Sequence, residues 1–153
     1  MSHDAEKSII APVPIDDFYQ TVVDYLAYPH ITDEVKSAHI VSRDGPVSIV
    51  HFTAKIMFRS FDYTLRMVED RPHGMSWTFV SSNTLTENRG WWKLEAISPH
   101  ETKVTYWNEL GARSWLPNGF INALARVVLP RVLRRWSAYA QAQIQARSAA
   151  RSA

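Results

Sequence analysis

Apolar and polar residues alternate along most of the chain between Val35 and Leu110. A period of two is typical of a strand that covers the core with one face and meets solvent with the other. Polar links with turn-forming residues interrupt the pattern, for example at residues 43–46 and 98–100. We therefore expect six strands in a meandering antiparallel sheet. The run from Val50 to Phe58 places Phe58 on the inward face.

The segment before these strands combines one strand with helical spacing. Residues 7–11 are rich in β-branched side chains and end at Pro12, which predicts a first strand. Apolar residues then recur at helical intervals over residues 15–26, and two acids occupy the first turn, where they favour the helix dipole. We expect a helix there and one more helical turn near residues 30–34.

The segment 116–146 carries the longest helical pattern. Its apolar residues recur three or four positions apart, at Ile121, Ala125, Val128, Val132, Trp136 and Tyr139. A helix of this length is roughly 45 Å long and would cross a small domain. Pro130 lies inside it and is expected to bend it. The bend either lets the helix follow a curved sheet or serves as a hinge.

These elements predict an α+β fold with a seven-stranded, curved antiparallel sheet wrapped around one long C-terminal helix. Two short helices follow the first strand. We expect a single domain over residues 1–146 and a frayed tail over residues 147–153, which contains only Ala, Ser and Arg. A cavity is expected wherever the sheet curves more than one helix can fill.

The composition excludes several kinds of catalytic and metal-binding site. The chain of 153 residues has no cysteine, which excludes disulfides and thiol catalysis. Its six histidines share no metal-ligand spacing, and no phosphate-binding loop or nucleophile elbow is present, so we expect neither metal nor cofactor. No apolar run approaches the ~20 residues of a membrane span. Without a recognisable signal peptide, we expect a cytoplasmic protein.

Charge is unevenly distributed. Residues 1–110 contain ten basic and fifteen acidic residues, whereas residues 111–153 contain seven Arg and no acid. Arg131, Arg134 and Arg135 share one predicted helix surface. This basic patch is either a solvated helix face or a site for an anionic partner such as a membrane surface or RNA.

Side chains on the predicted inward faces are the candidate ligand site. They are Phe61, Tyr63, Leu65, Trp77, Phe79, Trp92, Leu94, Tyr106 and Asn108 from the sheet, and Leu124, Val128 and Trp136 from the helix. A buried Asn108 either bonds a neighbouring strand or Tyr63, or orients a ligand. The aromatic residues fit a plain core and a pocket wall about equally.

Four short motifs carry a resemblance to a known family. They are Ile-x-Ala-Pro at residues 9–12, Asp-Tyr-x-x-Tyr-Pro at 24–29, Gly-Trp-Trp-Lys-Leu at 90–94 and Thr-Lys-Val-Thr-Tyr at 102–106. In this order the chain resembles the START-like (SRPBCC) superfamily, which has the helix-grip fold, and within it the polyketide cyclase/dehydrase and coenzyme Q-binding group. The resemblance covers about residues 7–146.

The resemblance implies a hydrophobic cavity between sheet and C-terminal helix, but this fold carries several functions. We expect a non-catalytic binding or transport protein for a hydrophobic small molecule such as a lipid, quinone or polyketide. One alternative is a polyketide cyclase or dehydratase that folds its substrate in the cavity. Another is a ribosome- or RNA-associated regulator that uses the basic helix. The sequence indicates no catalytic residue and no oligomeric state.

Overall fold

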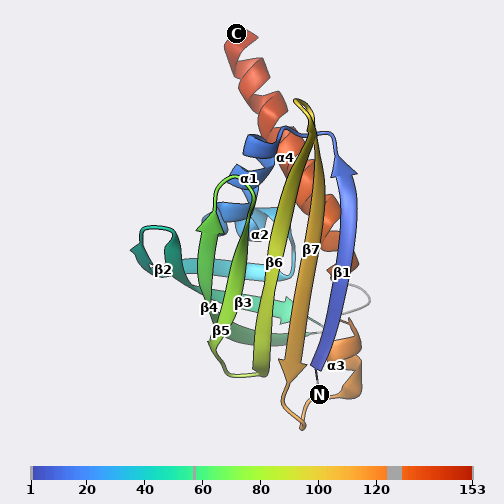
Figure 1. The fold of residues 1–153 in the computed structure, drawn as a ribbon. Helices are drawn as coiled ribbons and strands as arrows, with labels where there is room; N and C mark the ends of the chain where they lie inside the picture. The colour runs from blue at the N-terminus through green and yellow to red at the C-terminus, as the bar shows by residue number, and fades with distance from the viewer. Residues whose placement is uncertain (1, 57, 124–128, 153) are drawn as a thin grey trace.

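The computed structural model describes residues 2–56, 58–123 and 129–152. Seven strands form one antiparallel sheet in the order β1-β7-β6-β5-β4-β3-β2. The strands are β1 (Ser2–Ala11), β2 (Val35–Asp44), β3 (Val47–Ile56), β4 (Arg59–Asp70), β5 (Gly74–Ser82), β6 (Leu85–Ser98) and β7 (Glu101–Ala112). Figure 1 shows β2 and β3 crossing the direction of β1, β6 and β7, so the sheet curls around its concave face. The expected seven-stranded curved sheet is confirmed.

Short helices follow β1, as expected, but they are more divided than the sequence suggested. They are α1 (Ile15–Val23), the 3-10 turn η1 (Tyr25–Ala27) and α2 (Tyr28–Ile31). In place of one helix over residues 15–26, α1 ends at Val23 because Asp24 leaves the helical conformation. Asp16 and Asp17 occupy the first turn of α1 and favour its dipole.

The C-terminal segment contains α3 (Asn118–Ala123) and α4 (Leu129–Ser152). α4 continues past residue 146, and it contacts α1, α2 and β1. The predicted helix over 116–146 includes residues 124–128, which lie outside the described residues. Pro130 follows them closely, so its role as a fixed bend or a hinge stays a prediction.

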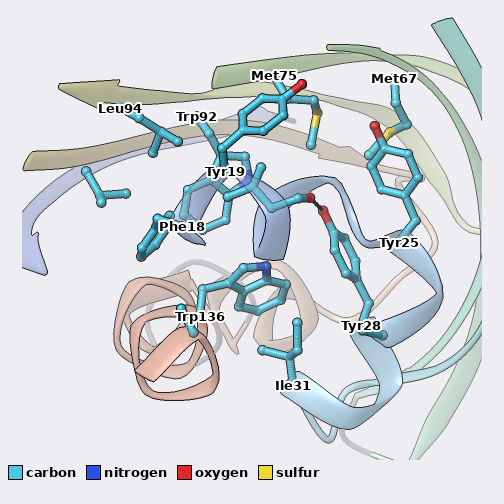
Figure 2. Close-up of a cluster of buried hydrophobic side chains, with 14 of the residues drawn as sticks. Phe18, Tyr19, Tyr25, Tyr28, Ile31, Met67, Met75, Trp92, Leu94 and Trp136 are labelled. Atoms are coloured by element: carbon cyan, nitrogen blue, oxygen red, sulfur yellow. Dashed lines mark hydrogen bonds between the residues drawn. The ribbon is translucent and has the colours of Figure 1, made fainter. Parts of the chain in front are cut away.

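A closed core fills the space between α1, the sheet and α4. Val13, Phe18, Val22, Leu94 and Val104 are among its least exposed members, at 1% or less. Figure 2 shows this cluster, with Phe18 and Trp136 approaching from α1 and α4. At its α1 side, the Thr102 hydroxyl donates to the Val13 carbonyl oxygen at 2.7 Å.

One inward assignment from the sequence is wrong. Phe58 lies in the β3–β4 turn with a left-handed φ of 66°, and its side chain is 97% exposed. The alternation of β3 ends at Ile56, so the period of two does not extend to Phe58. No helix in the described part of the chain is long and apolar enough to cross a bilayer.

Candidate functional site

A cavity of about 140 Å³ lies on the concave face of the sheet, next to α4. Its apolar wall comes mainly from alternating positions of β3, β4, β5, β6 and β7. The described lining residues are Tyr28, Thr32, Glu34, Val35, Phe52, Ala54, Ile56, Phe61, Tyr63, Leu65, Met67, Met75, Trp77, Leu85, Asn88, Trp92, Tyr106, Asn108, Leu110, Val132 and Trp136.

Aromatic rings contact one another around this cavity. Phe52 and Tyr63 stack across β3 and β4 with their centroids 5.3 Å apart. Trp92 and Tyr106 meet edge to face at 4.8 Å across β6 and β7. Trp136 reaches from α4 towards Tyr28, at 5.1 Å between centroids (Figure 2). Rings in mutual contact hold one another in place, so the wall has a defined shape.

Asn88 and Asn108 form a buried polar group in this apolar wall. The Asn88 Oδ1 atom accepts hydrogen bonds from Trp77 Nε1 at 3.0 Å and from Asn108 Nδ2 at 3.1 Å. The same Asn108 nitrogen also donates to the Arg89 carbonyl oxygen at 3.2 Å. These two hydrogen bonds of Nδ2 fix the orientation of the Asn108 amide group. Its Oδ1 atom accepts no hydrogen bond from the described residues.

Two buried polar atoms of the cavity lining have no partner among the described residues. They are Oδ1 of Asn108, an acceptor, and Nε1 of Trp136, a donor. A buried polar atom without a partner costs about 1–3 kcal/mol. A third such atom, Oγ of Ser48, lies on β3 outside the lining. Asn108 and Trp136 thus line the cavity, while these two polar atoms are themselves covered by neighbouring groups.

Tyr63 and Tyr106 add hydroxyl groups to the lining. Burial raises the pKa of both phenols well above the ordinary value of 10, so both stay protonated at any physiological pH. Neither hydroxyl bonds another side chain in the described part of the chain, in contrast to Tyr28, whose hydroxyl donates to the Val22 carbonyl at 2.6 Å. Both are free to donate to a ligand oxygen.

The polar end of the cavity is formed by the link between α2 and β2. Arg135 Nη1 donates to Thr32 Oγ1 and to Glu34 Oε2, each at 2.7 Å, and the Thr32 hydroxyl also donates to Glu34. Burial alone would raise the pKa of Glu34, but the bonds from Thr32 and from its own backbone N–H, together with the Arg135 charge, outweigh it and lower the pKa. Glu34 is therefore ionised at neutral pH and joins the link to α4.

The position of the Trp77 indole depends on Gly90. A Cβ at Gly90 would lie 2.5 Å from the Trp77 ring and 2.3 Å from the Trp107 carbonyl oxygen. Both distances are far below van der Waals contact. Only glycine leaves the space in which the indole lies against β6, beside Asn88.

Most of the residues predicted for the ligand site line the cavity. Phe61, Tyr63, Leu65, Trp77, Trp92, Tyr106, Asn108 and Trp136 do so. Leu94 does not, because it lies farther along β6 in the closed core at 1% exposure. Phe79 is absent from the lining and packs between the two hydrophobic clusters, half-buried. Leu124 and Val128 lie outside the described residues.

Four polar residues of the site, Thr32 among them, were not predicted. Asn88 could have been found, because it precedes Trp92 by two inward positions on the same strand. Tyr28 and Glu34 lie on irregular backbone around α2, where no hydrophobic period indicates which side chain points inward. Finding them requires the fold.

Only part of the basic patch is free to bind an anionic partner. Arg135 is bonded to Glu34, and Arg131 lies 3.9 Å from the same carboxylate with 44% of its side chain exposed. Arg134 is exposed. One acid thus offsets two of these three cations, and binding of RNA or a membrane through this surface stays a prediction. Among the described residues, no three His, Asp or Glu side chains cluster as metal ligands would.

The fold occurs in other proteins of known structure. The Zhui aromatase/cyclase from Streptomyces sp. R1128 superposes with a TM-score of 0.81 at 12% identity, over 94% of this chain and 96% of that one. A START superfamily protein from Mycobacterium smegmatis also gives 0.81, at 14% identity over 92% and 99%. A protein from Thermus thermophilus gives 0.79, at 14% identity over 92% and 99%. At these identities the likeness shows the helix-grip fold.

No curated protein matches the sequence. A family does match, over residues 2–144, and its description is "Polyketide cyclase / dehydrase and lipid transport". The match covers nearly the whole chain and agrees with the START-like resemblance of the four motifs. The chain therefore belongs to the polyketide cyclase/dehydrase and lipid transport family of the START-like superfamily.

Proposed function

We propose that this protein binds a compact, mainly apolar molecule that carries a hydrogen-bonding group. The observation that carries the proposal is the unpartnered pair in the cavity lining, Asn108 Oδ1 and Trp136 Nε1. A ligand that carries a donor and an acceptor and shifts these two side chains on entry would satisfy both atoms. Burial of the ligand's apolar surface would supply most of the affinity, about 25 cal/mol per Å².

The cavity volume limits the ligand. About 140 Å³ is below the ~300–1,000 Å³ of pockets that take drug-sized molecules. It is close to the ~150 Å³ of an engineered protein cavity that binds benzene. One aromatic ring is therefore the favoured guest, either alone or as the buried part of a larger lipid, quinone or polyketide.

A matched pair of probes tests this proposal. We expect p-cresol to bind about fivefold to tenfold more tightly than p-xylene, because its hydroxyl can meet the free donor and acceptor, and one hydrogen bond contributes about 1 kcal/mol. Calorimetric titration of both compounds measures the ratio. Trp136→Phe, which deletes the free N–H, should reduce the preference for p-cresol. Leu94→Met, in the closed core, should leave it unchanged.

Two results would contradict the proposal. One is that neither compound binds, or that p-xylene binds as tightly as p-cresol. The other is that native mass spectrometry of protein purified from its own host repeatedly finds no bound small molecule. Filling the cavity with Ala54→Phe should weaken p-cresol binding at least tenfold, because Ala54 lines the wall.

A cyclase or dehydratase activity is the second candidate. The observation in its favour is the pair of protonated hydroxyls on Tyr63 and Tyr106, which could polarise a substrate carbonyl in a confined space. The fold is shared with a protein named as an aromatase/cyclase. Against it, Glu34 is the carboxylate among the described lining residues, and its pairing with Arg135 keeps it from acting as a general base.

A cytoplasmic location stays a prediction.

A double substitution tests this candidate. Tyr63→Phe with Tyr106→Phe should abolish the conversion of a poly-β-ketone chain to cyclised products, while p-cresol binding falls far less. Mass spectrometry of the products measures the conversion, and calorimetry measures p-cresol binding. If the unmutated protein yields no more product than the spontaneous reaction does, the cyclase candidate is wrong and only the binding proposal remains.

A further inference from the structure

Two aromatic side chains lie exposed at one end of the sheet. Phe58, in the β3–β4 turn, is 97% exposed, and Trp115, before α3, is 60% exposed. The Arg59 guanidinium lies over the Trp115 ring at 5.5 Å from its centroid, so the two segments are adjacent. Figure 1 places α3 at the end of the sheet opposite the C-terminus of α4.

The backbone conformation of Phe58 makes this residue costly for the stability of the folded protein. A φ of 66° is left-handed, and a large side chain is disfavoured there by about 1–2 kcal/mol relative to glycine. Glycine or asparagine is the usual choice at such a turn position. A nearly fully exposed ring makes no packing contact that would offset this penalty. Contact with another molecule would account for a phenylalanine at this position.

The two segments that carry the exposed rings contain cations and no acid. Residues 55–61 and 111–123 contain Lys55, Arg59 and Arg113 and no acid. Acids lie on the neighbouring strands, at Asp62 on β4 and at Glu87 on β6 opposite Gly111. The segments that carry the exposed aromatics therefore contribute only cations.

We propose that this end of the molecule docks on an anionic lipid bilayer surface. Phe58 and Trp115 would enter the interface between headgroups and acyl chains, where aromatic rings are favoured. Lys55, Arg59 and Arg113 would meet the lipid phosphates, at about fivefold in affinity per cation. Two rings at loop tips with few cations fit a bilayer better than RNA, which is met by a broader basic surface.

The patch adjoins residues that pack against one wall of the cavity. Directly beneath it, Leu116, Phe120 and Ile121 pack with Phe61, and the Phe61 and Phe120 rings meet edge to face at 5.4 Å. Phe61 also lines the cavity. Docking through Phe58 and Trp115 would thus bring the α3 end of the cavity to the membrane, which goes beyond ligand binding in solution.

Co-sedimentation with lipid vesicles tests the proposal. The protein should bind vesicles of phosphatidylcholine mixed with phosphatidylglycerol, and bind pure phosphatidylcholine more weakly. Phe58→Asn with Trp115→Ser should weaken binding at least tenfold, and Lys55→Glu with Arg113→Glu by a similar factor. Asparagine tolerates the left-handed φ, so a thermal melt should show that Phe58→Asn leaves the fold intact.

Two matched controls come from the opposite end and from α4. Ile97→Ser removes an exposed apolar side chain, 53% exposed, next to the β6–β7 turn. Arg134→Glu reverses an exposed charge on α4. Neither should change vesicle binding by more than about twofold, as expected for residues away from the contact.

The proposal is overturned if the protein ignores both kinds of vesicle, or if Ile97→Ser and Arg134→Glu weaken binding as much as the variants of the patch. Salt-sensitive RNA binding through the same residues, without vesicle binding, would also overturn it. Binding of p-cresol in solution is measured without vesicles, so failure here leaves the proposed cavity function separately testable.

Discussion

The closed core around α1 and the cavity wall contain the same kinds of residue but differ in how their polar atoms are satisfied. In the closed core, Thr102 bonds the Val13 carbonyl, and Tyr28, at its border with the cavity, bonds the Val22 carbonyl. In the cavity wall, Asn108 Oδ1 and Trp136 Nε1 have no partner in the described part of the chain. Hydrophobicity alone does not separate the two regions.

The difference shows how a binding site can be distinguished from a core. Aromatic rings are equally at home in both, since both are apolar and buried. Ser48 Oγ on β3 is also unpartnered, outside the cavity, so what distinguishes the wall is that two such atoms belong to residues lining one cavity. The proposed binding function rests on this coincidence more than on the volume.

The largest expected effect compares two leucines. Leu94→Ala in the closed core should lower the free energy of unfolding by about 4–5 kcal/mol, and Leu65→Ala in the cavity wall by about 2–3 kcal/mol. Leu65 already borders empty space, so its truncation loses fewer contacts. Urea unfolding measures both. Equal losses would mean that the cavity wall packs as tightly as the closed core.

A smaller effect concerns Glu34 and depends on pH. Because the folded-state pKa of Glu34 is below its ordinary value of 4.5, its stabilisation is complete above that pH and is lost as pH falls through the folded value. At pH 7, Glu34→Gln should cost about 1–2 kcal/mol, since the carboxylate accepts a charged hydrogen bond at a partly exposed site. The cost should vanish in strong acid.

The matched control is Thr102→Val in the closed core. It leaves the Val13 carbonyl without its donor at 0% exposure, which should cost about 1–3 kcal/mol at every pH. Unfolding measured at neutral and acidic pH compares the two variants. A pH-independent loss for Glu34→Gln would show that the salt bridge with Arg135 does not stabilise the folded state.

The smallest effect compares two tryptophans of the cavity wall. Trp77→Phe removes an N–H that bonds Asn88, whereas Trp136→Phe removes an N–H without a partner. With the same loss of volume, the second variant should be about 1 kcal/mol more stable than the first in ligand-free protein. Thermal melts measure the difference. The opposite order would indicate that Trp136 Nε1 is satisfied in solution.

The sequence predicted the sheet and most of the cavity wall because both follow from a period of two. Asn108 and Trp92 share faces with apolar neighbours on regular strands, so their direction could be inferred. Leu94 shows the limit of this reasoning. It points inward like Trp92, but only the position of α1 decides that its end of the strand is filled rather than hollow.

Irregular backbone could not be predicted in this way. Phe58 continues the alternation in the sequence, yet it lies in the turn between β3 and β4 with a left-handed φ, and its side chain is exposed. Glu34 lies between α2 and β2, where side-chain direction depends on tertiary contacts with Arg135. The sequence places Arg131, Arg134 and Arg135 on one helix surface, but only the fold shows that the Glu34 carboxylate lies beside two of them.

Gly90 has a consequence for how this protein can diverge over time. Its missing side chain leaves the space against which the Trp77 indole lies. A single methyl group there would clash with the Trp107 carbonyl oxygen of β7 as well as with the indole, so any other residue at position 90 would disturb the pairing of β6 with β7 together with the cavity wall. Position 90 is therefore held to glycine by the fold itself, whatever molecule the cavity takes.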